Sequence, residues 1–221
     1  MLRAAGVFVC LWTTMASAQT NYSFTLPVNM AVPDGSTSGL ALNVDLTGLD
    51  GIIANLTLSL NITGGYNGDL YATLAGPNGG FSVLLNRVGI TTGHAFGYSN
   101  TGFDVIFDDT AGHDNIHLYQ NLSYDLNDSG QLTGIWASDG RFIDPLSDPA
   151  VFDATQTTLS LDSFNRTDPN GTWTLLVADV SGGGQSTVVN WGLSIETVPE
   201  PSTYALQGIG IALFLARKRM I

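Results

Sequence analysis

Lysine is missing from most of this chain. Residues 19–198 contain no lysine, and three arginines face 18 acidic residues there, which gives this stretch a formal charge of −15. A protein of that charge repels phosphate backbones, and we therefore expect no nucleic acid among its partners. Most other basic residues stand at the chain end, where Arg217, Lys218 and Arg219 occur together.

Cysteine is almost as scarce, since the chain has only Cys10. It lies in residues 1–18, which begin with a charge, continue as an apolar stretch and end on the small-residue pattern formed by Ala16 and Ala18. This arrangement is typical of a signal peptide, and a buried first helix is the alternative. Cleavage would leave an exported protein without disulfides, whose stability must come from a packed core.

Residues 198–221 contain three parts in order. A short motif comes first, consisting of Val198, Pro199, Glu200 and Pro201. An apolar run of 13 residues and the terminal basic cluster follow. A run of this length is short for a stable membrane span, which needs about 20 residues, and a basic cluster after it would stay in the cytoplasm. We therefore expect transient membrane insertion of a short hydrophobic helix, with a retained anchor as the alternative.

These three parts resemble the PEP-CTERM sorting signal of Gram-negative bacteria. The resemblance implies that an exosortase, a membrane protease, recognises the tail and cuts it near the Pro-Glu-Pro motif. It also implies an exported protein at the cell surface or in the extracellular matrix. The tail departs from the family pattern in its short apolar run and in Gln207 within that run.

Between the two ends, residues 19–197 form one expected domain in which apolar and polar residues alternate. No stretch has a convincing helical period, and turn residues such as Gly, Asn and Pro separate the alternating segments. Strands are expected at Tyr22–Val28, Leu40–Leu46, Ile53–Ile62, Leu70–Leu74, Phe81–Leu85, Phe103–Phe107, Thr172–Val177 and Val189–Ile195. Residues 108–158 are less regular and are expected to form long loops. The pattern predicts an all-β sandwich or jelly roll of eight or more antiparallel strands.

The same domain is similar to a P/Homo B domain over about residues 30–196. The resemblance rests on motifs in family order at Asn61–Gly79, Leu84–Arg87, Phe103–Asp109, Asn170–Asp179 and Thr187–Ile195. It implies a jelly-roll β-sandwich, best known as the non-catalytic domain after the subtilisin-like domain of proprotein convertases. No protease domain precedes it in this sequence, so we expect no enzymatic activity of its own.

Four residues in these motifs are expected to serve the fold. Asp69 precedes a strand, where its carboxylate can accept backbone N–H groups, and Asp179 is assigned a similar capping role. Trp173 and Trp191 fall on inward positions of neighbouring strands, and we expect both in the core.

Calcium is the cofactor that this composition favours. Asp104, Asp108 and Asp109 crowd one region, and adjacent carboxylates repel each other unless a cation or hydrogen-bond donors lie nearby. Calcium prefers such oxygen ligands. The P/Homo B resemblance makes a calcium site plausible, because P domains of bacterial secreted proteins can hold this ion. The alternative is a set of surface turns in an acidic protein.

A zinc site is disfavoured by the sequence. His113 and His117 stand four residues apart, as zinc ligands on a helix can, but Asp114 follows His113 where zinc proteases have Glu. No helical pattern surrounds them, so we expect a solvated loop. A Gly-x-Ser-x-Gly element of serine hydrolases is also missing from the sequence.

Three functions therefore compete. The first is a non-catalytic structural or adhesive protein of the cell surface or matrix. The second is a carbohydrate-binding module for extracellular polysaccharide, in which exposed Tyr66, Tyr71 or Trp136 stack on sugar rings. The third is an accessory to a serine-type endopeptidase of the subtilisin and kexin kind.

Overall fold

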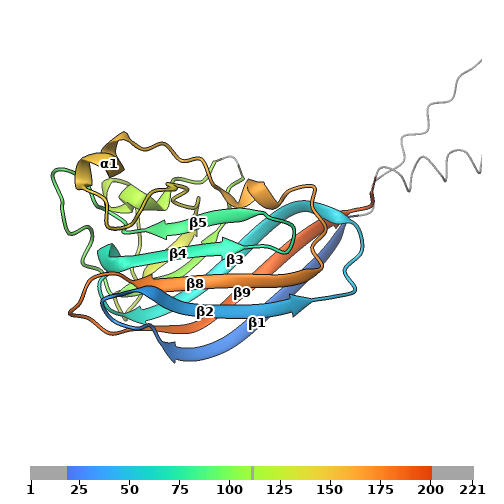
Figure 1. Ribbon diagram of the computed structural model, residues 1–221, viewed down its shortest axis with the longest axis horizontal. Helices are drawn as coiled ribbons and strands as arrows, with labels where there is room; N and C mark the ends of the chain where they lie inside the picture. Colours follow the sequence, from blue (N-terminus) through green and yellow to red (C-terminus); the bar gives the residue numbers. More distant parts are fainter. Residues whose placement is uncertain (1–18, 111, 201–221) are drawn as a thin grey trace, which may run out of the picture.

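The computed structural model describes residues 19–110 and 112–200. The predicted signal peptide with Ala16 and Ala18, residue Pro201 and the predicted C-terminal hydrophobic helix lie outside them. The described residues form a β-sandwich of nine strands in two sheets (Figure 1). The five-stranded sheet has the order β1 (Thr20–Ala31), β9 (Ser186–Val198), β3 (Ile52–Gly64), β6 (Gly102–Phe107) and β7 (Leu132–Trp136). The four-stranded sheet has the order β2 (Ser36–Leu46), β8 (Gly171–Asp179), β4 (Leu70–Ala75) and β5 (Phe81–Asn86).

All eight strands that the alternation predicted are present, and β7 was missed. Its five residues lie inside the irregular stretch, and the two central ones after Thr133 are exposed, which hides any two-residue period. The expectation of purely antiparallel pairing was wrong for β7, because it pairs in parallel with β6. The 24 residues between these two strands are long enough for the crossover that a parallel pair needs.

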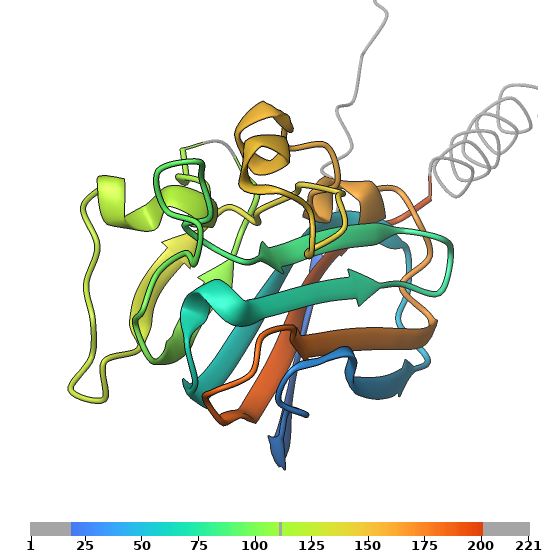
Figure 2. The same cartoon turned by 60° about the vertical axis from the view of Figure 1, so that its left-hand side comes forward.

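Short helical turns and loops cover one side of the sandwich. These are α1 (Pro149–Ala154) and the 3₁₀ helices η1 (Asn67–Asp69), η2 (Ile116–Asn121) and η3 (Leu161–Phe164). Figure 2 shows that the segments between β5 and β8 gather beyond β5. None of the helices in the described ranges is long and apolar enough to cross a membrane.

The core lies between the sheets, where inward residues of both sheets interdigitate. Trp173 on β8 and Trp191 on β9 are both fully buried there. The ring of Trp173 packs at 5.1 Å from that of Phe164 in η3, and its indole N–H donates to the carbonyl of Pro169 at 2.9 Å. Buried aromatics of this size supply much of the apolar area that stabilises a sandwich without disulfides.

Strand β9 defines two ends of the molecule. It begins with Ser186 beside Gly64 and ends with Val198 beside Ile52, while Thr197 also pairs with Thr20. We call the end with Thr20 and Val198 the terminal pole and the end with Gly64 and Ser186 the loop pole. At about 3.3 Å per residue, a strand of this length separates the poles by roughly 40 Å.

Candidate functional site

The sorting motif begins inside the fold at the terminal pole. Val198 is the last residue of β9, and Pro199 and Glu200 continue directly from it. Gly51 lies against this end with a φ of +87°, and a Cβ there would stand 2.4 Å from the Val198 carbonyl oxygen. Only glycine therefore allows the chain before β3 to approach the start of the motif so closely.

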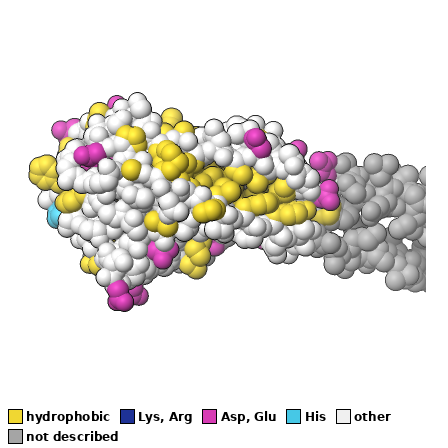
Figure 3. Space-filling model, turned by 90° about the horizontal axis from the view of Figure 1, so that it is seen from below, with side chains coloured by type: hydrophobic (Ala, Val, Ile, Leu, Met, Phe, Trp, Pro, Cys, Tyr) yellow, Lys and Arg dark blue, Asp and Glu magenta, His cyan; other side chains and the backbone are white. Residues whose placement is uncertain are grey.

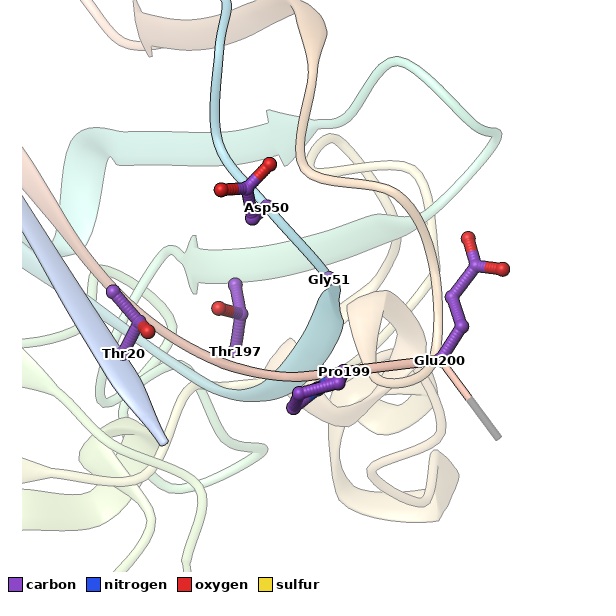
Figure 4. A pocket seen from close by; sticks show the side chains of 6 residues that line it. All are labelled: Thr20, Asp50, Gly51, Thr197, Pro199 and Glu200. Atoms are coloured by element: carbon purple, nitrogen blue, oxygen red, sulfur yellow. The ribbon is translucent and has the colours of Figure 1, made fainter. Parts of the chain in front are cut away.

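A shallow pocket surrounds this point (Figure 4). Its lining consists of Thr20, Asp50, Gly51, Thr197, Pro199 and Glu200. Two of these residues are acidic and none is basic, so the pocket is unsuited to an anionic ligand. The pocket lies where the beginning and the end of the described chain meet, and the sorting motif leaves the sandwich at this surface.

A second hollow of about 320 Å³ lies at the loop pole. It is lined by Tyr66, Gly93, His94, Ala95, Phe96 and Gly97. The side chain of Phe96 is 76% exposed, more than any other large apolar residue in the described chain. The hydroxyl of Tyr66 donates to the carbonyl of Gly97 at 3.2 Å, which holds the tyrosine ring beside this segment.

Hydrogen bonds fix the segment that carries Phe96, here called the aromatic loop (residues 91–98). Thr91 and His94 exchange two backbone hydrogen bonds, and Gly97 N–H donates to the His94 carbonyl at 3.1 Å. Gly97 has a φ of +70°, and a Cβ there would stand 2.5 Å from the Val88 carbonyl oxygen. A backbone held this way lowers the ordering cost when the exposed phenyl ring binds a ligand.

The sequence analysis missed Phe96 and was wrong about Trp136. Trp136, expected as an exposed platform, is buried, and its indole N–H donates to the Thr133 carbonyl at 2.9 Å. Tyr71 is half-buried on β4 and does not line the hollow. The sequence does contain a signal for an exposed Phe96, because Gly93 and Gly97 on either side of it indicate a tight loop.

The expectation of a solvated loop around both histidines was wrong for His117. Its ring is almost fully buried, with Nδ1 2.6 Å from Asp139 Oδ2 and Nε2 3.1 Å from the carbonyl of Ile90. Arg141 donates to the other Asp139 oxygen at 3.0 Å. His113 lies apart, 3.7 Å from Asp108, so the two histidines do not converge. The buried group is an internal ion-pair network that joins η2 to the loop after β7.

The three aspartates expected to bind calcium have different surroundings. Asp104 is exposed on the outer face of β6, and Asp108 accepts the backbone N–H of Thr110 at 2.9 Å. Asp109 accepts three hydrogen bonds, from the N–H and hydroxyl of Ser138 at 2.6 and 2.7 Å and from the N–H of Leu161. In the described ranges, no three His, Cys, Asp or Glu side chains come together as a metal site. Three hydrogen-bond donors therefore already satisfy the Asp109 carboxylate without a cation, and calcium stays a prediction.

Asp69 and Asp179 face each other at the loop pole, where Asp179 pairs with Leu70. Arg87 lies 3.8 Å from Asp69, and Asp179 receives long hydrogen bonds of 3.4 Å from Ser181 N–H and the Ser186 hydroxyl. Burial raises the pKa of Asp69, although Arg87 opposes this. Burial, reinforced by Asp69 and Asp34, raises the pKa of Asp179 to about 6.

Comparison with known families confirms the sorting motif. Residues 197–219 match the PEP-CTERM protein-sorting motif. This motif implies export, exosortase-dependent sorting and association with the cell surface. No curated protein matches this chain.

Two similar solved structures come from Aeromonas sobria. The complex of a serine protease with its chaperone has a TM-score of 0.46 and 13% identity, over 83% of this chain and 28% of that chain. The serine protease alone has a TM-score of 0.45 and 13% identity, over 81% of this chain and 27% of that chain. The chain thus spans less than a third of either relative, and a likeness at this level carries no argument about activity.

We predict that Asp109→Asn lowers the free energy of unfolding by about 2–4 kcal/mol, because an amide cannot accept all three buried donors. Urea unfolding measures this, and Asp104→Asn on the exposed face of β6 is the matched control, with a change below about 0.5 kcal/mol. A melting temperature that rises with millimolar calcium in the native protein, but not in Asp109→Asn, would show instead that Asp109 is a metal ligand.

We predict that the stabilising contribution of Asp179 falls as the pH rises from about 4 to about 6. Folded Asp179 keeps its proton to about pH 6, whereas the unfolded chain releases it near its ordinary pKa, so stabilisation present below pH 4 is lost across this window. The largest loss that this shift permits is about 3 kcal/mol.

Asp179→Asn should flatten that pH dependence. Its melting temperature should equal that of the native protein at pH 4 and exceed it at neutral pH, while Asp128→Asn on an exposed turn should keep the native profile. Parallel profiles for the native protein and Asp179→Asn would contradict the assignment to Asp179.

Proposed function

We propose that this chain is a non-catalytic protein of the cell surface or extracellular matrix, with a jelly-roll sandwich of the P/Homo B kind sorted by an exosortase. The observation that carries the proposal is the sorting-motif match, which starts at residue 197 within the last strand of the sandwich. The sandwich domain and its sorting motif are therefore continuous, because the Pro-Glu-Pro motif follows directly on β9.

The position of the motif supports processing without unfolding. Strand β9 ends at Val198, and Pro199 has no N–H to contribute to the ladder. Cleavage on the C-terminal side of this proline would leave every pair between β9 and its neighbours intact. Insertion of the tail in the membrane would bring the terminal pole to the membrane and direct the loop pole away from it.

The internal pairing of the polar groups supports a structural role. In the His117–Asp139–Arg141 network, His117 and Asp139 are almost fully buried, and the ring of Phe152 stacks on His117 at 5.8 Å. An accessory role beside a serine-type endopeptidase is a further prediction of the P/Homo B resemblance. A calcium ion at Asp104, Asp108 and Asp109 is a prediction of the same kind.

We predict that replacing Pro199 and Glu200 together by alanine blocks processing in a host that has an exosortase. The precursor should accumulate in the membrane fraction, because the protease no longer recognises its motif, and immunoblotting of cell fractions measures this. Glu196→Ala, on β9 just before the motif, is the control and should be processed normally. Equal processing of the double variant, or of the native chain in a host without exosortase, would contradict the proposal.

The hollow at the loop pole that Tyr66 and Phe96 flank, here called the aromatic hollow, supports a second function. This function is the binding of neutral extracellular polysaccharide. Aromatic faces stack on the C–H faces of sugar rings, and Phe96 and Tyr66 flank a hollow whose lining carries no Asp, Glu, Lys or Arg. The hollow lies at the loop pole, opposite the sorting motif, where a displayed domain would meet the matrix. The acidic body disfavours acidic polysaccharides.

We predict that Phe96→Ala weakens binding to a neutral polysaccharide by on the order of tenfold or more, since it removes the exposed ring of the platform. Affinity electrophoresis in gels containing neutral or acidic polysaccharides measures this. Phe142→Ala removes a ring that is 63% exposed elsewhere and should bind like the native protein. Unchanged retardation of Phe96→Ala, or none of the native protein in any gel, would contradict this function and leave the sorting proposal intact.

A further inference from the structure

One long side of the sandwich remains open along the edge strands β1 and β2. Seven inward-facing apolar side chains there are only partly buried, and we call them the seam: Tyr22, Phe24, Leu26, Val28, Leu40, Leu42 and Val44. Figure 3 shows hydrophobic side chains as a continuous stripe along this side of the molecule. The neighbouring strands β9 and β8 contrast with them, because their inward residues Leu193, Ile195 and Leu175 are fully buried.

The open side follows from the topology. Strand β1 ends one sheet and β2 ends the other, so the two edges stand opposite each other with no described strand beyond either. The opposite side of the sandwich is covered by the segments between β5 and β8 (Figure 2). Contiguous apolar surface and an unpaired strand edge are the two features that soluble proteins usually hide.

Charge points to what covers this side. Strand β1 has no charged residue, and β2 has only Asp45, in a body of net charge −15. Protective lysines, which keep natural edge strands apart, are missing from both strands. A basic partner would be drawn to the acidic remainder of the surface. A second copy carries the same net negative charge, and the uncharged β1 edges are where two copies can approach with the fewest like charges opposed to one another.

The backbone limits which part of β1 can pair with another strand. Its ladder with β9 is regular from Thr20 to Pro27 and then shifts register before Met30. Asn29 in this bulge has a φ of +50°, and Pro27 has no N–H to donate. The usable edge is therefore Thr20–Leu26, whose outward residues Asn21, Ser23 and Thr25 are exposed.

We propose that the partner is a second copy of this chain, paired through antiparallel contact of the Thr20–Leu26 edges. A closed dimer needs a two-fold axis, and an edge-to-edge parallel ladder has none, so the pairing is antiparallel. The axis stands perpendicular to the sheet, which joins the two five-stranded sheets into one and keeps both four-stranded sheets on the same face. The two seams then face each other and merge into one enclosed apolar layer.

This dimer has a consequence for the order of events, which rests on the proposed sorting function. The antiparallel strands direct the terminal poles of the two copies in opposite directions. Each tail leaves alongside the body of the other copy, so a tail inserted in a membrane would drive that body into the same membrane. Dimerisation therefore follows release from the tail.

The scarcity of cysteine makes a sharp test possible. In the full chain with Cys10→Ser as background, Asn21→Cys, Ser23→Cys and Thr25→Cys are introduced one at a time, and processed protein is recovered after export. Mild oxidation should give a disulfide-linked dimer on non-reducing gels, strongest at the one position nearest the two-fold axis. Thr57→Cys, on the same face but on the interior strand β3, is the control and should stay monomeric.

Thr25→Lys tests the dimer without touching the seam, since this side chain lies on the outer face of the sheet, away from the core. In sedimentation experiments it should weaken dimerisation by on the order of tenfold or more while the melting temperature of the monomer and the processing of the tail stay native. A native protein that sediments as a monomer, cross-linking of Asn43→Cys on β2 in place of the β1 positions, or equal cross-linking of unprocessed protein in membranes would overturn the proposal.

Discussion

The pairing of β9 with a strand on each side is the interaction on which this molecule depends. Its 13 residues lie between β1 and β3, carry Trp191 into the core and end on the first residue of the sorting motif. Because the first and last strands of the domain are neighbours, the start and end of the described chain meet at one pole. The aromatic loop, which is hydrogen-bonded to Tyr66 and Gly68 after β3, occupies the other pole. The sorting motif and the aromatic loop therefore lie at opposite poles of the sandwich, and β9 connects the two poles.

Several aspartates in the described part of this protein accept hydrogen bonds from backbone N–H groups and hydroxyls, and few of them pair with an arginine. Asp109 holds Ser138 and the start of η3, and Asp139 combines His117, Arg141 and the N–H of Asn86 in one buried group. Such carboxylates join loops that have little regular structure between β7 and β8. A chain without lysine in its body can still satisfy buried charge in this way. Its remaining surface is left strongly negative, and the neutral edge of β1 stands out against it.

Much of the fold could be predicted because the determining signal was local. Alternation such as Leu56, Leu58 and Leu60 marks a half-buried strand whatever its partners are, and the tail motif is contiguous in sequence. Strand β7 could not be found, because its parallel partner lies across a long crossover and its own alternation is broken. The sites were harder still. Asp109 looks like a metal ligand in sequence and becomes an acceptor for three donors only when the segments around 138 and 161 fold against it.

The position of β9 between β1 and β3 also affects when the five-stranded sheet can form. A chain exported from its N-terminus delivers β1 and β3 first, yet neither has its shared partner until residues 186–198 have emerged. The five-stranded sheet is thus a structure of high contact order that closes only at the end of translocation. A chain truncated before β9 would lose both the strand that joins β1 to β3 and the sorting motif that follows it.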